Sequence, residues 1–409
     1  MRLLIISQMS HYLRGNQIVG WGPTVHEIDH LAQIFDEIRH VACLHSETAP
    51  SSALPYSSNR VSLVPVPMVG GEGLLKKLDV VRLTPLFIRT IWKELKKADV
   101  VHVRCPANTS LLAIVLLALV RAPRIRWVKY AGNWRPDSKE SWSYTFQRWW
   151  LKKGLHRGVV TINGRWPDQA SHLYSFLNPC ITEDELSRAQ AFASAKQMSR
   201  PLRLLFVGRL AKVKGVDRAL SILSSLQKRG LSVKLDLVGD GPERAEFEEL
   251  ARKLGVGDLT KFHGWLPRTA LAPLYGEAHV MVFPTDSEGW PKVLSEAMAY
   301  GVVPVCSSVS SIPQYLEEFG TGRMFEPDDV EGFAGAIADY YSSPDIWKRE
   351  SEMGVKASQS FTYTNYIAAV RKILNMKINE LENTSFVEGN PGTFVPPISF
   401  DKLDLRNRS

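Results

Sequence analysis

The sequence contains few cysteines, and they form no pattern that binds a metal. Its four cysteines lie far apart, and no two of them are spaced as a CxxC pair or as another set of metal ligands. This spacing excludes a zinc site built on cysteines. It favours reduced thiols in a cytoplasmic protein.

Long apolar segments are absent as well. The most apolar run, Leu111–Val120, is much shorter than the about 20 residues that a helix needs to cross a bilayer. The amino-terminal stretch MRLLIISQMSHY has a short apolar run but no long hydrophobic region and no small-residue cleavage site. It therefore predicts a first strand rather than a secretion signal.

Acidic residues are scarce in the first part of the chain. The net charge is +8, and residues 1–180 account for it, because the remainder is slightly acidic. A basic half can attract nucleic acid, anionic lipid headgroups or phosphorylated small molecules. The sequence has no zinc-finger spacing, no RNP-like aromatic motif and no basic arm, so a nucleic-acid-binding protein is the least favoured hypothesis.

What is present indicates a folded protein with two domains. Hydrophobic residues make up 44% and charged residues 22% of the sequence, which is ordinary for a folded protein. A chain of 409 residues is longer than one hydrophobic core usually accommodates. Short apolar runs alternate with helix-length segments, and the alternation starts again after a polar connector. The expected fold class is α/β, with two Rossmann-like, doubly wound domains facing each other across a cleft. The expected divisions are an amino-terminal domain at 1–180, a connector at 181–200, a carboxyl-terminal domain at 201–345, helices at 346–380 that can pack back on the first domain, and an irregular tail at 381–409.

Two loops of the second domain follow strands, at the edge where open α/β sheets bind ligands. In VGRLAKVKG, Gly208 is followed by Arg209 and Lys214, so two cations lie beside a helix start and can bind an anion. A pair of solvated surface charges is the alternative. In GDGPE, the glycines permit a close backbone approach, although a plain turn explains them equally well.

A third loop, SEGWPKVLSEAMAYG, opens a helix between two glutamates. Pro291 suits the first helical position, which leaves the amides of Lys292 and Val293 free to face an anion. Glu296 lies one turn inside the helix, where a carboxylate can hold a diol, and Glu288 stays on the loop. A surface pair of Lys292 with Glu296 is the alternative, and it leaves Glu288 unexplained.

These segments resemble the retaining glycosyltransferases of family 4, whose fold is called GT-B. VGRLAKVKG, GDGPE, FHGWLP and SEGWPKVLSEAMAYGVVPV stand in the order and spacing of that family, across residues 202–329. The first half resembles the family in its succession of strands and helices and in the strand ADVVHVR. The resemblance implies metal-independent transfer of a sugar from a nucleotide-diphosphate sugar, without a cofactor.

The resemblance also implies a role for each matching residue. Arg209 and Lys214 would bind the donor diphosphate and stabilise the charge that grows on it as the glycosidic bond breaks, and Glu288 would contact the transferred sugar. These three are the expected catalytic residues. The expected donor-binding residues include Glu296 at the ribose and the amides of Lys292 and Val293 at the phosphates. They also include Gly208 at the start of the loop of Arg209, Gly264 and Leu266 near the base, and Gly20 and Gly22 in place of the usual Gly-Gly turn. The expected donor is a UDP-sugar, with a GDP-sugar as the alternative.

On the acceptor side the sequence departs from the family. Many members carry a histidine after the strand that matches RWVKY, whereas this chain has AGNW. Asn133, Arg135 and Asp137 on this loop are the expected acceptor-side residues. The loop from Gln8 to Trp21 is also expected to be long.

Residues 141–157, SWSYTFQRWWLKKGLHR, interleave aromatic and basic side chains. The pattern is typical of an interfacial helix at an anionic membrane, and a helix whose tryptophans pack on the sheet is an equal alternative. The first interpretation suits a lipid-linked acceptor, as in bacterial cell-surface polysaccharide synthesis, at the inner face of the cell membrane. A soluble sugar acceptor is the other possibility.

Other enzyme classes compete with this hypothesis. A nucleotide-sugar epimerase or a phosphorylase would use the same fold and cleft. A glycosidase also needs two carboxylates, but it binds no diphosphate, so the cations beside the helix start argue against it.

Overall fold

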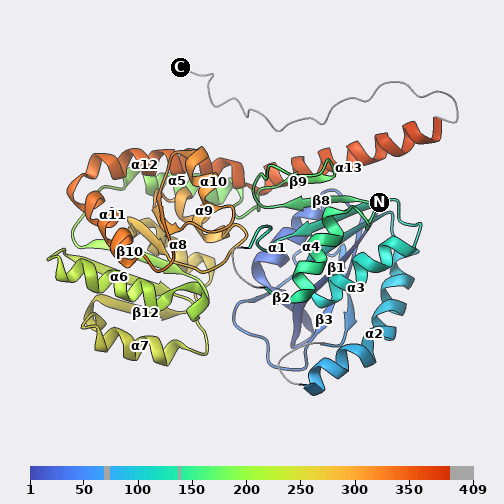
Figure 1. The fold of residues 1–409 in the computed structure, drawn as a ribbon, viewed down its shortest axis with the longest axis horizontal. Helices are drawn as coiled ribbons and strands as arrows, with labels where there is room; N and C mark the ends of the chain where they lie inside the picture. The colour runs from blue at the N-terminus through green and yellow to red at the C-terminus, as the bar shows by residue number, and fades with distance from the viewer. Residues whose placement is uncertain (69–73, 137–139, 387–409) are drawn as a thin grey trace.

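The computed structural model of the chain describes residues 1–68, 74–136 and 140–386. Two α/β domains lie side by side, and helix α13 (Tyr363–Phe386) runs from the carboxyl-terminal domain over the amino-terminal one (Figure 1). Each domain has its own sheet and its own buried apolar core.

The amino-terminal domain is built on a nine-stranded sheet. Seven strands pair in parallel in the order β5-β3-β1-β6-β7-β8-β9, and β2 and β4 add an antiparallel extension to β1. The apolar runs predicted as strands in this half all form strands. The strands are β1 (Arg2–Arg14), β2 (Gln17–Trp21), β3 (Glu37–Leu44), β4 (Ala53–Pro55), β5 (Val61–Val66), β6 (Val100–Cys105), β7 (Ile125–Tyr130), β8 (Val159–Ile162) and β9 (Leu173–Ser175).

The expectation of a long loop from Gln8 to Trp21 is wrong. Strand β1 continues to Arg14, turns at Gly15 with a φ of 59°, and pairs with β2 in an antiparallel hairpin. A glycine adopts this left-handed conformation without strain, so the chain can reverse tightly and bond to itself.

Helices cover both faces of the amino-terminal sheet. Helices α2 (Leu74–Leu95), α3 (Asn108–Leu119) and α4 (Trp142–Lys152) lie on one face, and α1 (Gly22–Leu31) and α13 lie on the other. The predicted apolar face of α1 is buried, as Ile28 and Leu31 pack with strand residues. None of the helices in the described part of the chain is long and apolar enough to cross a membrane.

The carboxyl-terminal domain is built on a six-stranded parallel sheet in the order β12-β11-β10-β13-β14-β15. All six predicted strands form, and helices connect them on both faces. The strands are β10 (Leu202–Val207), β11 (Val233–Val238), β12 (Thr260–Gly264), β13 (Val280–Phe283), β14 (Val303–Ser307) and β15 (Arg323–Phe325). The helices are α6 (Val216–Lys228), α7 (Arg244–Lys253), α8 (Arg268–Glu277), α9 (Lys292–Ala299), α10 (Ile312–Phe319) and α11 (Val330–Ser342).

The segments that join the domains are helical. Helix α5 (Glu183–Ala195) begins with a capping box between Thr182 and Glu185 and packs against α8, α9 and α12 (Pro344–Ser358), so the expected connector is part of the second domain's helical layer. Helix α13 extends to Phe386, so the expectation of an irregular tail is wrong for residues 381–386. Residues 387–409 of that expected tail lie outside the described residues.

Candidate active site

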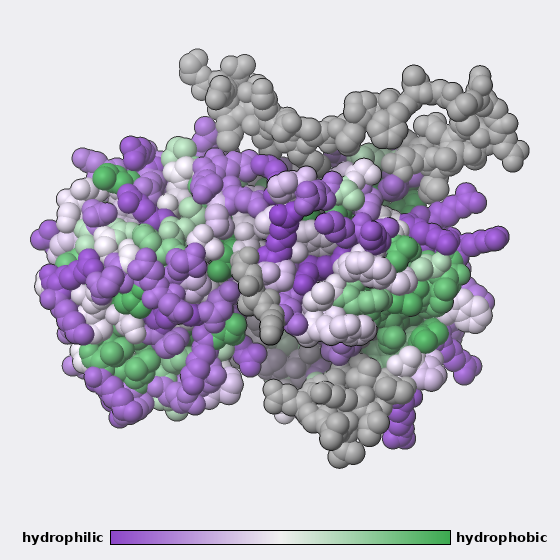
Figure 2. Space-filling model, viewed as in Figure 1, coloured by the Kyte–Doolittle hydropathy of each residue, from purple (hydrophilic) through white to green (hydrophobic). Residues whose placement is uncertain are grey.

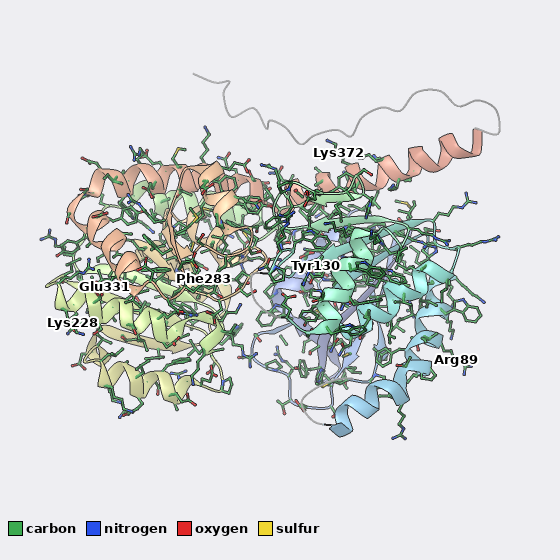
Figure 3. The ribbon with its side chains drawn as sticks, viewed as in Figure 1. Arg89, Tyr130, Lys228, Phe283, Glu331 and Lys372 are labelled. Atoms are coloured by element: carbon green, nitrogen blue, oxygen red, sulfur yellow. The ribbon has the colours of Figure 1, made fainter. Side chains whose placement is uncertain are left out.

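The carboxyl ends of the strands in both sheets face the boundary between the domains. Figure 3 shows Tyr130 at the end of β7 and Phe283 at the end of β13 on the sides of the two domains that face each other. Parallel α/β sheets bind ligands at this edge. The loops after β10, β11 and β13 lie there, and they contain the three predicted catalytic residues.

The loops after β10 and β11 are tied together by their backbones. Gly208 N donates to Val238 O at 2.9 Å, and Leu210 N donates to Asp240 O at 3.1 Å. Gly239 has a φ of 135°, and a Cβ there would lie 1.8 Å from Gly208 O. The glycines of GDGPE therefore have a structural role, because they let this loop support the loop that carries Arg209.

The two predicted catalytic cations differ in their surroundings. Arg209 is exposed, and within the described ranges it makes no hydrogen bond or ion pair. Lys214 ends a short 3-10 helix (Lys212–Lys214), and its ammonium pairs with the Glu288 carboxylate. Both partners in that pair are partly exposed, at 26% and 18% of their side chains. The structure thus brings Lys214 and Glu288 together and leaves Arg209 available to an anion.

The loop of Lys214 and the loop after β13 also contact each other through their backbones. Asp286 N donates to Val213 O at 3.0 Å. Gly215 has a φ of 75°, and a Cβ there would lie 1.9 Å from Pro284 O. Only glycine permits this approach, which holds Lys214 opposite Glu288.

Helix α9 begins one residue later than the sequence predicts. Pro291 is the N-cap residue, and Lys292 is the first helical residue. Leu294 N donates to Pro291 O at 3.1 Å, while the amides of Lys292 and Val293 lie in the first turn, where a helix provides no internal acceptor. The Lys292 side chain does not pair with Glu296. It reaches the amino-terminal domain instead and donates to Glu27 Oε2 at 3.2 Å.

Glu296 lines a cavity of about 360 Å³ between α5, α8 and α9. Tyr275 OH donates to its Oε2 at 3.1 Å, and Arg268 Nη1 lies 3.9 Å from its Oε1. Burial raises the pKa of Glu296 above its ordinary value of 4.5, and Arg268 and Tyr275 offset part of that rise. Tyr300 also lines the cavity and stacks on Tyr275 at 5.4 Å between ring centroids.

The predicted base-binding residues lie on the turn between β12 and α8. Gly264 has a φ of 71°, and its carbonyl accepts from Gly239 N at 2.9 Å. Leu266 is partly buried against the core of the domain. The turn is therefore fixed in place by the loop after β11, at the same edge of the sheet as Gly208.

Gly20 and Gly22 lie in the amino-terminal domain, where packing explains both. A Cβ on Gly20, in β2, would lie 2.5 Å from Met9 Cε, and a Cβ on Gly22, at the start of α1, would lie 2.9 Å from Leu54 Cδ1. The nearest atoms thus belong to the same domain.

Two of the three predicted acceptor-side residues, Asn133 and Arg135, lie in the described part of the chain. Asn133 is nearly buried, and its Oδ1 accepts from Arg135 N at 3.0 Å, which is an Asx-type turn. The Arg135 side chain pairs with Asp168 at 2.8 Å and lies over the Trp166 ring. Asp137 lies outside the described residues.

Sequence reasoning missed Glu27, which is fully buried on α1. Arg104 and Lys129 donate to its carboxylate, and so does Lys292 from the other domain. A signal was present in the sequence, because Glu27 stands four residues before Leu31 and so shares its apolar helical face. A charged residue on such a face needs buried partners.

The described residues contain no group of three or more His, Cys, Asp or Glu side chains arranged to hold a metal ion.

Comparison with known structures identifies the fold. The chain resembles sucrose-phosphate synthase from Thermosynechococcus elongatus with a TM-score of 0.67 and 18% identity, over 95% of this chain and 100% of that one. It resembles HepE from Anabaena, solved in complex with UDP and glucose, with a TM-score of 0.62 and 15% identity, over 94% of this chain and all of the other. The chain has the GT-B fold, as the sequence predicts.

Comparison of sequences finds a family that matches part of the chain. Residues 187–359 match the model of the family described as glycosyl transferases group 1. Glycogen synthase of Mycobacterium tuberculosis strain H37Rv is 31% identical over 160 residues, which are 39% of this chain and 39% of that protein. The matched region thus spans well under half of this relative. Residues 187–359, most of the carboxyl-terminal domain, thus resemble a group 1 glycosyl transferase domain.

Proposed function

We propose that the protein is a retaining, metal-independent glycosyltransferase that moves a sugar from a nucleotide-diphosphate sugar to an acceptor. The observation that carries this proposal is the arrangement at the carboxyl edge of the second sheet. There the Lys214 ammonium meets the Glu288 carboxylate, and Arg209 is unpaired among the described residues.

The chemistry follows from charge. When the bond between the sugar and the diphosphate breaks, negative charge grows on the leaving diphosphate. Arg209 and Lys214 would stabilise that charge, and the first amides of α9 would add to the effect. Glu288 would hold Lys214 in position and contact the departing sugar. Transfer by these residues would not require a metal ion.

A UDP-sugar is the proposed donor. The Glu296 cavity has room for part of a nucleoside, and a carboxylate can accept hydrogen bonds from both hydroxyls of a ribose. The similarity to HepE, which was solved with UDP, supports uridine. A GDP-sugar is the alternative that the experiment below distinguishes.

A lipid-linked acceptor is the proposed partner, and the surface of the amino-terminal domain supports it. Figure 2 shows an apolar area on the right-hand lobe, where Figure 1 places α3 and α4. Large apolar side chains are exposed on three helices that lie side by side: Leu86, Ile88 and Trp92 on α2, Leu119 on α3, and Trp142, Tyr144 and Trp149 on α4. We call these residues the three-helix apolar face.

Different residues of helix α4 suit the two interpretations of its sequence, packing on the sheet and lying at a membrane interface. Trp150 donates to Ile114 O at 3.2 Å, and Leu151 is fully buried, so this side packs on the domain. Trp142 is 75% exposed, and Lys152 and Lys153 are exposed beside the apolar face. Exposed tryptophans next to lysines suit the interface of an anionic membrane, where a lipid-linked acceptor would be presented.

The proposal is tested by ligand binding and product analysis. UDP, GDP and ADP should be compared by thermal shift, and one diphosphate should raise the unfolding temperature selectively, since it binds only the native state. Turnover of the matching sugar nucleotide should persist in EDTA, and mass spectrometry should detect a glycosylated acceptor. An epimerase would instead convert the sugar nucleotide without an acceptor. The proposal would be refuted if none of the three diphosphates raised the unfolding temperature.

A further inference from the structure

Glu27 connects four other elements of the fold through one carboxylate. Its Oε1 accepts from Arg104 Nη1 on β6 and from Lys129 Nζ on β7, both at 2.7 Å. Tyr366 OH on α13 donates to the same oxygen at 3.2 Å, and Lys292 Nζ on α9 donates to Oε2 at 3.2 Å. Lys292 is thus the one contact among these that comes from the body of the carboxyl-terminal domain.

The amino-terminal domain already neutralises Glu27 without Lys292. Burial alone would raise the pKa of Glu27, but Arg104, Lys129 and Lys292 hold it well below its usual range. Arg104 alone supplies a full cation for one carboxylate, and Lys129, whose pKa burial lowers from 10.5 to about 7, is a second partner. A third cation is therefore not needed to stabilise the buried charge. The ion pair with Lys292 must therefore be explained by what it does between the domains.

The loop before Lys292 contacts the amino-terminal domain at a second point. A Cβ on Gly289 would lie 2.2 Å from Ala131 O and 2.4 Å from Asn163 Nδ2. Glycine is needed here because the backbones of the two domains approach so closely. The segment from Gly289 to Lys292 is held at both ends by the amino-terminal domain, and the first turn of α9 follows directly.

We infer that Glu27 is a positioning residue for the reaction: through Lys292 it holds the amino end of α9, with its proposed diphosphate-binding amides, in register with the amino-terminal domain. Glu27 touches no substrate. Its effect is to fix where the donor's reacting carbon lies relative to the acceptor. The diphosphate-binding amides of α9 are aligned with the acceptor only while the two domains are closed. This inference deepens the proposed function and rests on it for the role of α9.

Lys292→Met tests the inference, because it removes the link and leaves Glu27 paired with Arg104 and Lys129. Small-angle scattering should show a larger radius of gyration than in the unsubstituted protein, since the domains separate more easily. Transfer should fall by about 100-fold from misalignment. The Kd for UDP should stay within about threefold, because the amides of α9 remain. Lys292→Arg should restore both the radius and the transfer rate.

Arg165→Met is the matched control. Arg165 pairs with Glu318 across the same domain boundary at 2.8 Å, but its side chain is 57% exposed. Because exposed ion pairs contribute little, this variant should leave the radius unchanged and alter transfer by less than about threefold.

Two results would overturn the inference. One is an unchanged radius of gyration in Lys292→Met. The other is a loss of UDP affinity of about tenfold or more with the radius unchanged, which would make the Lys292 side chain a donor ligand. If the unsubstituted protein binds no nucleotide diphosphate, the proposed function fails, but the scattering comparison still decides whether Lys292 links the domains.

Discussion

Lys214 and Glu288 stand 74 residues apart in the chain, and their side chains form an ion pair at the carboxyl edge of one sheet. The pair orients a cation that would otherwise be a flexible surface lysine. It also leaves the other carboxylate oxygen of Glu288 able to accept a sugar hydroxyl. The two residues therefore form one unit, and substitution of either should disturb the other.

Lys214→Met should lower kcat by about 100-fold or more, because an oriented cation that stabilises the leaving diphosphate is lost. Glu288→Gln keeps the size of the side chain but removes its charge, so Lys214 loses its orientation and kcat should also fall. Steady-state kinetics with the sugar nucleotide measure both effects. Lys212→Met, two residues earlier at an exposed pair with Glu246, is the control and should keep normal kcat. Normal kcat in Lys214→Met would contradict the assignment.

Arg209→Lys should lower kcat by about tenfold, although the charge is kept. The guanidinium binds a phosphate through two parallel hydrogen bonds, and an ammonium cannot reproduce that geometry. The unfolding temperature should not change, since Arg209 is exposed and unpaired among the described residues. Arg229→Lys, at an exposed pair with Glu331, provides the comparison. Equal kinetics for the two variants would remove Arg209 from the site.

Glu296→Ala should raise the Kd for UDP by about tenfold, because a charged acceptor for the ribose hydroxyls is lost. Since burial raises the pKa of Glu296, its carboxylate protonates at a higher pH than usual, and UDP affinity should decline as the pH falls through that pKa. Isothermal titration calorimetry measures both.

Tyr275→Phe gives the matched control for Glu296. It removes the hydroxyl that donates to Oε2 at 3.1 Å and stabilises the charged form. The decline in UDP affinity should therefore begin at a higher pH in this variant. UDP binding that is independent of Glu296 at every pH would place the ribose elsewhere.

His156 should make the protein less stable in mild acid. Burial lowers its pKa from 6.5 to about 3, so between these values the unfolded chain binds a proton that the folded chain does not. Stability from this group is present above pH 6.5 and is lost as the pH falls toward 3. Well inside this window the free energy of unfolding decreases by about 1.4 kcal/mol per pH unit.

His156→Phe keeps a ring in this fully buried position and removes the titration. Denaturant unfolding from about pH 7 to about pH 5 should give a smaller slope of stability against pH in this variant than in the unsubstituted protein. The buried His11 and His40 titrate in both proteins, so only the difference in slope reports His156. Identical slopes would contradict the prediction.

The three-helix apolar face should bind anionic vesicles. Binding to vesicles that contain phosphatidylserine should weaken with salt. Lys152→Glu with Lys153→Glu should reduce it by about 30-fold or more, since each cation near the surface contributes about 1 kcal/mol. Trp142→Ser should reduce it further by removing an exposed aromatic anchor. Lys228→Glu with Lys234→Glu changes the same charge on the other domain and should have little effect. Vesicle binding that is equal in all variants would refute the membrane contact.

The sequence by itself determined six of the nine strands of the amino-terminal sheet, all six strands of the other sheet, and the two loops that carry Arg209, Lys214 and Glu288. Apolar runs and strand-loop-helix patterns are local, and parallel strands bring successive loops to one edge of the sheet. The position of Glu296 on α9 could be predicted for the same reason. The packing roles of Gly20 and Gly22 could not, because the atoms that they approach belong to distant segments.

Only the tertiary structure decided how the two halves meet. Lys292 has Glu296 within reach on its own helix, yet it pairs with Glu27, which stands 265 residues away. Arg135 pairs with Asp168, and α4 divides its tryptophans between core and surface. A long, flexible cation has several candidate partners in any sequence. Burial against a second domain selects one of these partners. A fully buried carboxylate attracts the cation more strongly than an exposed carboxylate does, because water does not screen its charge.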